Sequence, residues 1–247
     1  MVSGYPPTYF AALAAVEERH WWHRGMRAIA ESLLGDRVRQ GGALLDAGCG
    51  TGGFLAWAAA GGFAPIAGVD VSAEAVETAR ARVPAADLHV APVWELPFPA
   101  AGFAVVACND VLQHVDEAMV GRSLGELRRV LRRDGALLLR TGGGRRPRRE
   151  RFDWRVYDPA GLRAELAAAG FRCERLSFVN TTGSLAARAR GHVPHAPTET
   201  SHGIPSLPRH GSDVRYGLLR AEAAVLRLPR MRLPYGHTIV ALAVPDS

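Results

Sequence analysis

The sequence contains no lysine, and all thirty of its basic residues are arginines. Without a lysine amine, Schiff-base chemistry and phosphate binding by a P-loop lysine are both excluded. The arginines outnumber the carboxylates and give a formal net charge of +6, which by itself would favour an anionic partner such as nucleic acid.

Cysteines are few, and long apolar runs are absent. Cys49, Cys108 and Cys173 lie far apart, which indicates neither a disulfide framework nor a zinc site. Histidines gather in the irregular segment 181–213, but their spacing matches no common zinc pattern, so we expect no metal. No apolar run is long enough to span a membrane, and the charged N-terminus is unlike a secretory signal. We therefore expect a soluble, cytoplasmic protein with no membrane partner.

Apolar periodicity predicts one main α/β domain. A chain of 247 residues with 48% hydrophobic composition is long enough to bury the core of such a domain. Residues 8–35 have helical spacing, and from residue 43 onward short apolar runs alternate with amphipathic stretches, as in βαβ units. The expected strands are 43–47, 65–70, 87–91, 103–108, 135–140, 171–179 and 237–244, and the later expected helices are 53–61, 73–82, 116–132, 159–169 and 214–228.

Residues 44–54 (LLDAGCGTGGF) form a strand, a glycine-rich turn and a helix start in direct succession. Glycines let the backbone adopt positive φ and let a ligand approach closely, and the turn exposes N–H groups beside a helix N-terminus. Such a turn suits a ligand with a nucleoside and a carboxylate or phosphate. Asp70, at the end of the second expected strand, is placed to accept hydrogen bonds from two ribose hydroxyls.

Two other interpretations of the turn remain open. Gly48, Gly50 and Gly53 match the spacing of a nicotinamide-dinucleotide fingerprint, although the surrounding residues and the later motifs go against it. The turn could also be purely structural.

Four motifs in order resemble the class I S-adenosylmethionine-dependent methyltransferases, in particular the small-molecule branch called methyltransferase type 11. They are LLDAGCGTGGF (44–54), GVDVS (68–72), ELPFPAAGFAVVACNDVLQHV (95–115) and ELRRVLRRDGALLLR (126–140). The resemblance covers about residues 15 to 180. It implies a Rossmann-like, mostly parallel seven-stranded sheet with an antiparallel last strand and helices on both faces.

The resemblance also implies four regions and a cofactor. Residues 1–40 would be an N-terminal helical cover, 41–180 the core that binds S-adenosyl-L-methionine, 181–235 an irregular flap and helix on the substrate side, and 236–247 the final strand.

Within the core, the resemblance assigns a role to each matching position. Asp46 would orient the turn or the methionine amine, and Asp70 would hold the ribose. Val71 would pack on adenine, and Asn109 would lie near the methionine amine. Gly48 and Gly50 would lie under the methionine and ribose, and Gly52 would be a third cofactor-binding glycine of the turn.

One position departs from the family pattern. The family usually has Gly-Asp-Ala before the LPF run, and this chain has Ala91-Pro92-Val93-Trp94. Pro92 has no carboxylate for the adenine amino group, so adenine recognition would rely on the Val93 backbone and on stacking by Trp94.

The N-terminal residues 18–27 resemble a family segment that folds over the cofactor. Arg24 would pair with the methionine carboxylate, and Trp21 or Trp22 would lie against the sulfonium. The alternative is a helix that packs its aromatic side chains into the core.

Substrate candidates follow the fourth and fifth strands, because ligands bind at the carboxyl ends of parallel strands. His114 is a candidate general base, with Asp110 sharing or orienting it; alternatively His114 caps the next helix or lines the cleft. Arg145 and Arg146 begin an arginine-rich loop that could bind an anionic acceptor or could be a solvated face. Tyr157 is expected to line the acceptor pocket.

Three functions are compatible with these features. The first is methyl transfer to O, N or C of a small molecule, in specialised metabolism, aided by proximity and exclusion of water. The second is a reaction without methyl transfer, such as cyclisation, in a protein that still binds the cofactor. The third is a nucleic-acid modifier or binder, which we do not favour because the aromatic residues do not alternate with arginines and no target-base motif follows the fourth strand.

Overall fold

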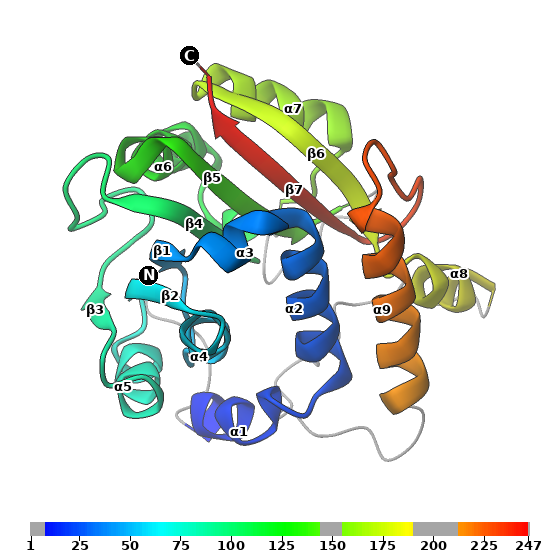
Figure 1. The fold of residues 1–247 in the computed structure, drawn as a ribbon, viewed down its shortest axis with the longest axis horizontal. Coiled ribbons are helices and arrows are strands. Elements are labelled where there is room, and N and C mark those ends of the chain that lie inside the picture. Colours follow the sequence, from blue (N-terminus) through cyan, green and yellow to red (C-terminus); the bar gives the residue numbers. More distant parts are fainter. Residues whose placement is uncertain (1–7, 144–154, 190–211, 247) are drawn as a thin grey trace.

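A computed structural model describes residues 8–143, 155–189 and 212–246. Its centre is a seven-stranded sheet with strand order β3-β2-β1-β4-β5-β7-β6 (Figure 1). The strands are β1 Gly42–Ala47, β2 Phe63–Asp70, β3 Asp87–Val90, β4 Phe103–Asn109, β5 Leu131–Gly142, β6 Phe171–Val179 and β7 Thr238–Pro245.

The strand directions confirm the predicted fold class. The pairs β1–β2, β1–β4, β2–β3 and β4–β5 are parallel, whereas β7 runs antiparallel to both β5 and β6. The carboxyl ends of β2, β1, β4 and β5 therefore meet at one edge of the sheet, where ligands bind in open α/β folds.

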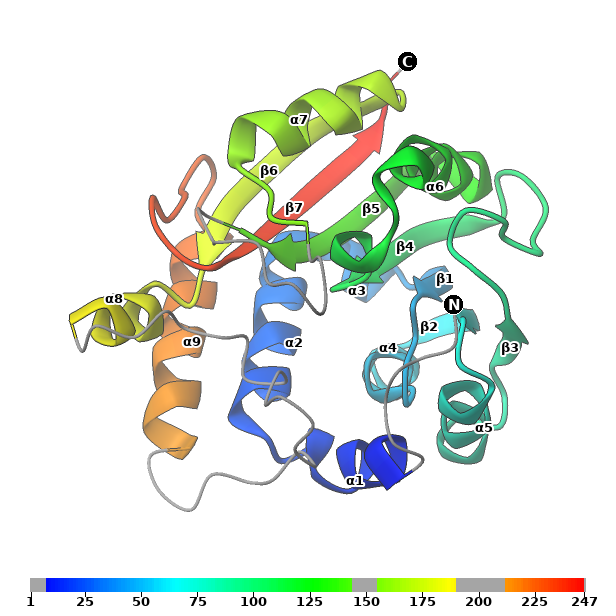
Figure 2. The same ribbon diagram turned by 180° about the vertical axis from the view of Figure 1, so that it is seen from behind.

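Helices cover both faces of the sheet. One face packs against α2, α4, α5 and α9, and the opposite face packs against α6 and α7 (Figures 1 and 2). The helices are α1 Thr8–Glu17, α2 Trp21–Leu34, α3 Asp36–Gln40, α4 Gly53–Ala60, α5 Ala73–Arg82, α6 Glu117–Val130, α7 Pro159–Ala168, α8 Thr181–Ala189 and α9 Ser212–Arg227, with a 3-10 turn, η1, at Leu112–His114.

Side-chain caps fix where helices begin at the ligand-binding edge. Ser72 Oγ accepts from the Ala75 N–H at the start of α5, and Asp116 Oδ1 accepts from the Ala118 N–H at the start of α6. Each cap satisfies a backbone donor that the helix leaves without a partner, worth about 1 kcal/mol. Because Asp116 is the cap of α6, the alternative role of His114 as that cap is wrong.

The segment 8–35 is helical, as expected, and it forms two helices. α1 ends at Glu17, and α2 begins at Trp21 after an extended residue, His20, whose Nδ1 accepts from the Trp22 N–H. Gly35 and Gly41, both with positive φ, then end α2 and α3. The break lets α1 lie along α5 while α2 packs on the sheet.

The expected irregular segment 181–213 needs a second correction, because Thr181–Ala189 forms α8. The buried carboxylate of Glu222, on α9, accepts from the Asn180 N–H at 2.7 Å and from the Thr182 N–H at 3.4 Å. It thereby caps α8 from a distant part of the chain, an arrangement that local sequence does not reveal. Residues 190–211 lie outside the described residues.

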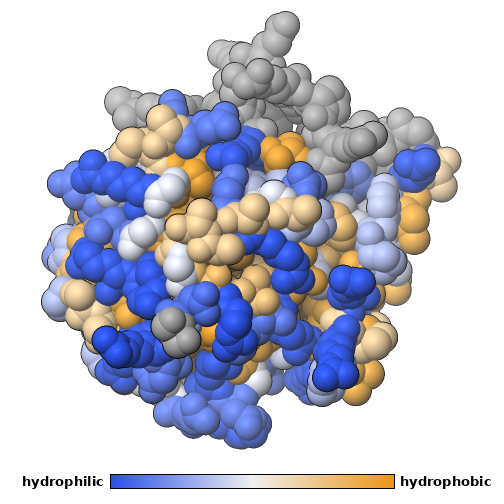
Figure 3. Space-filling model, turned by 90° about the horizontal axis from the view of Figure 1, so that it is seen from above, coloured by the Kyte–Doolittle hydropathy of each residue, from blue (hydrophilic) through white to orange (hydrophobic). Residues whose placement is uncertain are grey.

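Hydrophilic residues predominate on the face shown in Figure 3, with hydrophobic residues interspersed among them. Within the described ranges, no helix is both long enough and apolar enough to cross a membrane.

Close packing of α2 on α9 depends on Gly25. A Cβ placed there would lie 2.2 Å from Leu219 Cδ1 and 2.8 Å from Leu219 Cβ. We expect Gly25→Ala to lower the free energy of unfolding by about 1–3 kcal/mol, because the overpacking outweighs the gain in helix propensity. Urea unfolding measures the change.

The matched control is Gly125→Ala on α6, where a Cβ would meet no atom within 4 Å. That variant should be stabilised by up to about 1 kcal/mol. Equal effects at the two positions would contradict the tight α2–α9 contact.

Candidate cofactor and active site

The glycine turn between β1 and α4 is built from positive φ angles. Gly48, Gly50 and Gly52 have φ values of 93°, 50° and 78°, which favour glycine. A Cβ on Gly48 would lie 2.1 Å from Val111 Cγ2, so the turn also packs tightly against the loop after β4. At Gly50 a Cβ would meet nothing within 4 Å, so this part of the turn faces open space.

Asp70 ties this turn to the end of β2. Its Oδ2 accepts from the Gly50 N–H and its Oδ1 from the Ser72 N–H, both at 2.9 Å. Burial raises the pKa of Asp70, and the backbone hydrogen bonds oppose the rise. Each carboxylate oxygen accepts one N–H here and has a second lone pair for a ligand hydroxyl. Val71, next to it, is 54% exposed and presents an apolar surface.

Asp46 and Asn109 place unpaired polar atoms at the ends of two neighbouring strands. Asp46 is 2% exposed, and its Oδ1 has no hydrogen-bond partner within the described residues; the same holds for the buried Nδ2 of Asn109. Burial raises the pKa of Asp46 well above its usual range, with Arg140 opposing the rise. Unpaired buried atoms of this kind are costly and fit the polar end of a ligand.

The adenine side is more enclosed. Val93 is buried, and Trp94 is half-buried against the core cluster on the α6 side of the sheet. The Ala91 N–H donates to the Asp70 carbonyl at 3.0 Å, which holds the 91–94 segment beside the end of β2.

The N-terminal tryptophans are buried and belong to the core cluster under α2. Trp21 and Trp22 are 6% and 1% exposed. Arg24 turns toward α9, where its guanidinium lies 3.8 Å from the Tyr216 ring centre and 3.7 Å from Asp213 Oδ1. In this structure its partners are therefore on α9.

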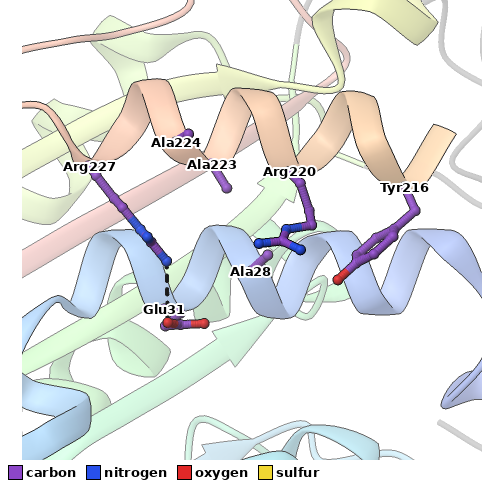
Figure 4. Close-up of a pocket in the computed structure, with 7 residues that line it drawn as sticks. All are labelled: Ala28, Glu31, Tyr216, Arg220, Ala223, Ala224 and Arg227. Carbon is purple, nitrogen blue, oxygen red and sulfur yellow. Dashed lines mark hydrogen bonds and ion pairs between the residues drawn. The ribbon is translucent and has the colours of Figure 1, made fainter. Parts of the chain in front are cut away.

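Tyr216 also lines a groove of about 280 Å³ between α2 and α9 (Figure 4). The Arg227–Glu31 ion pair, 3.3 Å long, bridges the two helices there. Its lining comes from these two helices alone and includes no residue of the glycine turn: Ala28, Glu31, Tyr216, Arg220, Ala223, Ala224 and Arg227.

The loop after β4 carries Asp110 and His114. Asp110 has a φ of 59° and forms an ion pair with Arg140, with 2.8 Å between Arg140 Nη2 and Asp110 Oδ2. Its carboxylate is thus held by β5. His114 lies at the end of η1, and its residue surface is exposed. Desolvation by the surrounding groups lowers the pKa of its ring, and the negative charge of Asp110 opposes that lowering.

Tyr157, which was expected to line the acceptor pocket, is 3% exposed, and its hydroxyl is buried without a hydrogen-bond partner in the described part of the chain. Arg155 stacks over the Tyr157 ring at 5.0 Å and pairs with Glu165. Burial raises the pKa of the Tyr157 hydroxyl. Arg145 and Arg146 lie outside the described residues.

Sequence reasoning missed several polar residues at this edge. Glu17 Oε2 accepts from Thr51 Oγ1 at 2.5 Å and from Arg82 Nη1 at 2.6 Å, which joins α1 to the glycine turn and to α5. Burial lowers the pKa of His23 to about 3, with Arg140 contributing. Arg140 itself was detectable, since it is a charged residue at the end of the apolar run 136–139, whereas the partners of Glu17 depend on long-range contacts.

Strand order, glycine turn and acidic partner together define a nucleotide-binding protein of the class I methyltransferase type. A family model described as "Methyltransferase domain" matches residues 45–139. A probable S-adenosylmethionine-dependent methyltransferase from Mycolicibacterium smegmatis is 30% identical over 179 residues, covering 70% of this chain and 67% of the relative. The chain belongs to the S-adenosylmethionine-dependent methyltransferases, and S-adenosylmethionine is its cofactor.

Solved structures share the fold. The 1,6-didemethyltoxoflavin-N1-methyltransferase of Burkholderia thailandensis has a TM-score of 0.59 and 18% identity, over 98% of this chain and 87% of that one. The geranyl diphosphate C-methyltransferase of Streptomyces coelicolor has a TM-score of 0.59 and 19% identity, over 91% and 78%. The [4+2]-cyclase SpnF has a TM-score of 0.57 and 23% identity, over 90% and 80%.

The residues of this chain fit the cofactor. Asp70 and the exposed Val71 suit a ribose and an adenine, and the open side of Gly50 admits a ligand against the backbone. The unpaired Asp46 Oδ1 suits an ammonium group.

We expect Asp70→Ala to raise the dissociation constant of S-adenosylhomocysteine about 10- to 150-fold, equivalent to the 1.5–3 kcal/mol of charge-assisted hydrogen bonds. The loss includes the bond that holds Gly50. Isothermal titration calorimetry measures it. Asp87→Ala, at the exposed start of β3, is the control and should bind like the wild type; a wild-type constant in Asp70→Ala would contradict the assigned role.

Cofactor affinity should rise with pH because the pKa of Asp46 is raised. A ligand ammonium favours the ionised carboxylate, so binding is weak below the pKa of Asp46 in the ligand-free protein, strengthens through it and levels off above it. We expect proton release on binding, seen as a buffer-dependent enthalpy. Asp46→Asn should abolish the release, and its persistence in that variant would assign the proton to another group.

Proposed function

We propose that this enzyme transfers the methyl group of S-adenosylmethionine to an O, N or C atom of a small molecule, with an anionic acceptor in natural-product biosynthesis as the specific case. The cofactor's sulfonium supplies the methyl group, and the protein aligns donor and acceptor and keeps water away.

The observation that carries the small-molecule part is the helical cover. Glu17, on α1, is bonded directly to Thr51 in the glycine turn, and Trp22, on α2, is buried beside Arg140. Helices seated this close to the cofactor turn restrict access to a compact acceptor. Methyltransferases with small acceptors, toxoflavin-type and geranyl diphosphate, share the fold over most of the chain.

The anionic part of the proposal rests on the run of arginines that follows β5 in the sequence. Arg155 already forms an ion pair with Glu165. We therefore expect an acceptor phosphate or carboxylate to bind the arginines that precede it in the sequence, which include Arg145 and Arg146. His114 is the proposed base and Asp110 its neighbour, while Tyr157 flanks the pocket.

A second function stays in view because a [4+2]-cyclase shares the fold. In that case the protein would bind the cofactor and rearrange a substrate without transferring methyl. A third function, action on nucleic acid, would need a larger open surface at the same edge.

The test uses S-adenosylmethionine labelled in the methyl group with small-molecule extracts separated by anion exchange. We expect label in the anion-retained fraction, with one S-adenosylhomocysteine formed per methyl transferred. Label found only in the neutral fractions would contradict the proposal that the acceptor is anionic. A converted substrate with unchanged cofactor would establish the cyclase-like alternative, and label in RNA would establish the third function.

In the same assay, Arg145→Ala with Arg146→Ala should raise KM for an anionic acceptor about 10-fold or more and leave the cofactor constant unchanged, because two charge-assisted contacts are lost. Arg132→Ala with Arg133→Ala, exposed at the start of β5, is the matched control. Equal KM values in the two double variants would show that Arg145 and Arg146 do not bind the acceptor and are solvated surface residues.

A further inference from the structure

The amino-acid end of the cofactor carries an ammonium and a carboxylate. The carboxylate needs hydrogen-bond donors and a positive charge. Two groups that could bind this carboxylate already have partners within this chain. A third group, Arg140, has the required donors.

The first place is the N-terminus of α4, whose backbone N–H groups ordinarily attract a ligand carboxylate. Glu17 lies over it: a Cβ on Gly53 would come 2.2 Å from Glu17 Cδ. Thr51 and Arg82 hold the Glu17 side chain there at 2.5 and 2.6 Å. A second carboxylate at this helix start would be repelled by the first.

The second place is Arg24, which the family resemblance favoured. Its guanidinium stacks on Tyr216 and lies 3.7 Å from Asp213, so α9 holds it.

The third place is a row of residues across the sheet. Leu44, Val105 and Leu138 all belong to the core cluster under α2, and the residues Asp46, Asn109 and Arg140 follow them on the same face of β1, β4 and β5 because strand side chains alternate. Asn109 pairs directly with Arg140 in the strand register. Among charged groups, Arg140 has the largest effect on the pKa of Asp46, which indicates proximity.

Arg140 has N–H donors that its ion pair with Asp110 does not use. Its side chain is 15% exposed, and its Nε and Nη2 contact the same Asp110 oxygen at 2.9 and 2.8 Å. Trp22 lies above it, with 6.0 Å from the ring centre to the guanidinium carbon. Trp22 Nε1 and Asn109 Nδ2 are buried N–H donors for which the described residues offer no acceptor.

We propose that Arg140, Trp22 Nε1 and Asn109 Nδ2 bind the α-carboxylate of S-adenosylmethionine, while Asp46 faces its ammonium. This rests on the cofactor assignment above. A carboxylate bound by these three donors would give hydrogen-bond partners to the two buried N–H groups of Trp22 and Asn109, whose lack of partners is costly. Asp46 would then lie on the side of the ammonium. Asp110 then orients Arg140 through the ion pair between them, while it also lies close enough to His114 to oppose the lowering of the histidine pKa.

The experiment compares two ligands that differ only in the carboxylate, S-adenosylmethionine and decarboxylated S-adenosylmethionine, by calorimetry. We expect the wild type to bind the first about 10- to 100-fold more tightly, as charge-assisted hydrogen bonds predict. In Arg140→Leu this ratio should fall to about 1–3, with little change for the decarboxylated ligand. Arg133→Leu, exposed near the start of the same strand, should keep the wild-type ratio.

Smaller changes keep the test decisive if Arg140→Leu does not fold, which thermal unfolding would show. Trp22→Phe removes one N–H and Arg140→Lys removes the planar fork; each should lower the ratio about 3- to 10-fold. A wild-type ratio near one, or an unchanged ratio in these variants, overturns the proposal. So does a ratio that collapses in Arg24→Leu instead. If neither ligand binds the wild type, the cofactor assignment itself fails.

Discussion

The attachment of the glycine turn to the end of β2 is the constraint on which the cofactor site depends. The N–H groups of Gly48 and Cys49 donate to the Val69 carbonyl at 2.8 Å, and the Gly50 N–H donates to Asp70. Because β1 and β2 are adjacent and parallel, their carboxyl ends meet and these bonds can form. The carboxylate that suits the ribose therefore also shapes the turn, so recognition and local fold share one residue.

Charged side chains gather at the edge of the sheet where we propose that the amino-acid end of the cofactor binds. Glu17 occupies the start of α4, Asp46 is buried with a raised pKa, and Arg140 forms an ion pair with Asp110 and opposes the rise in the pKa of Asp46. Burial, with help from Arg140, keeps His23 neutral at ordinary pH. Arg82 is partly buried as well but is paired with Glu17, whereas Arg140 lies next to donors that have no partner in the described chain.

The range matched by the family model and several residues of the proposed carboxylate site occupy different parts of the sequence. The match covers 45–139, which contains the turn, Asp70 and Asn109. Arg140 begins just beyond it, and the helical cover with Glu17 and Trp22 precedes it. Cofactor binding is thus the property that this chain shares with its family.

The sequence alone determined the seven strands, the parallel core and the turn with its acidic partner, because these depend on local periodicity and on glycine at fixed spacing. Tertiary structure decided the rest. Arg24 has the charge to bind a carboxylate, but the packing of α2 on α9 turns it to Tyr216. Thr181–Ala189 has loop-like composition, but Glu222 caps it as a helix. Ion-pair partners and helix caps of this kind join residues far apart in the chain, and only the packed fold brings their side chains within bonding distance.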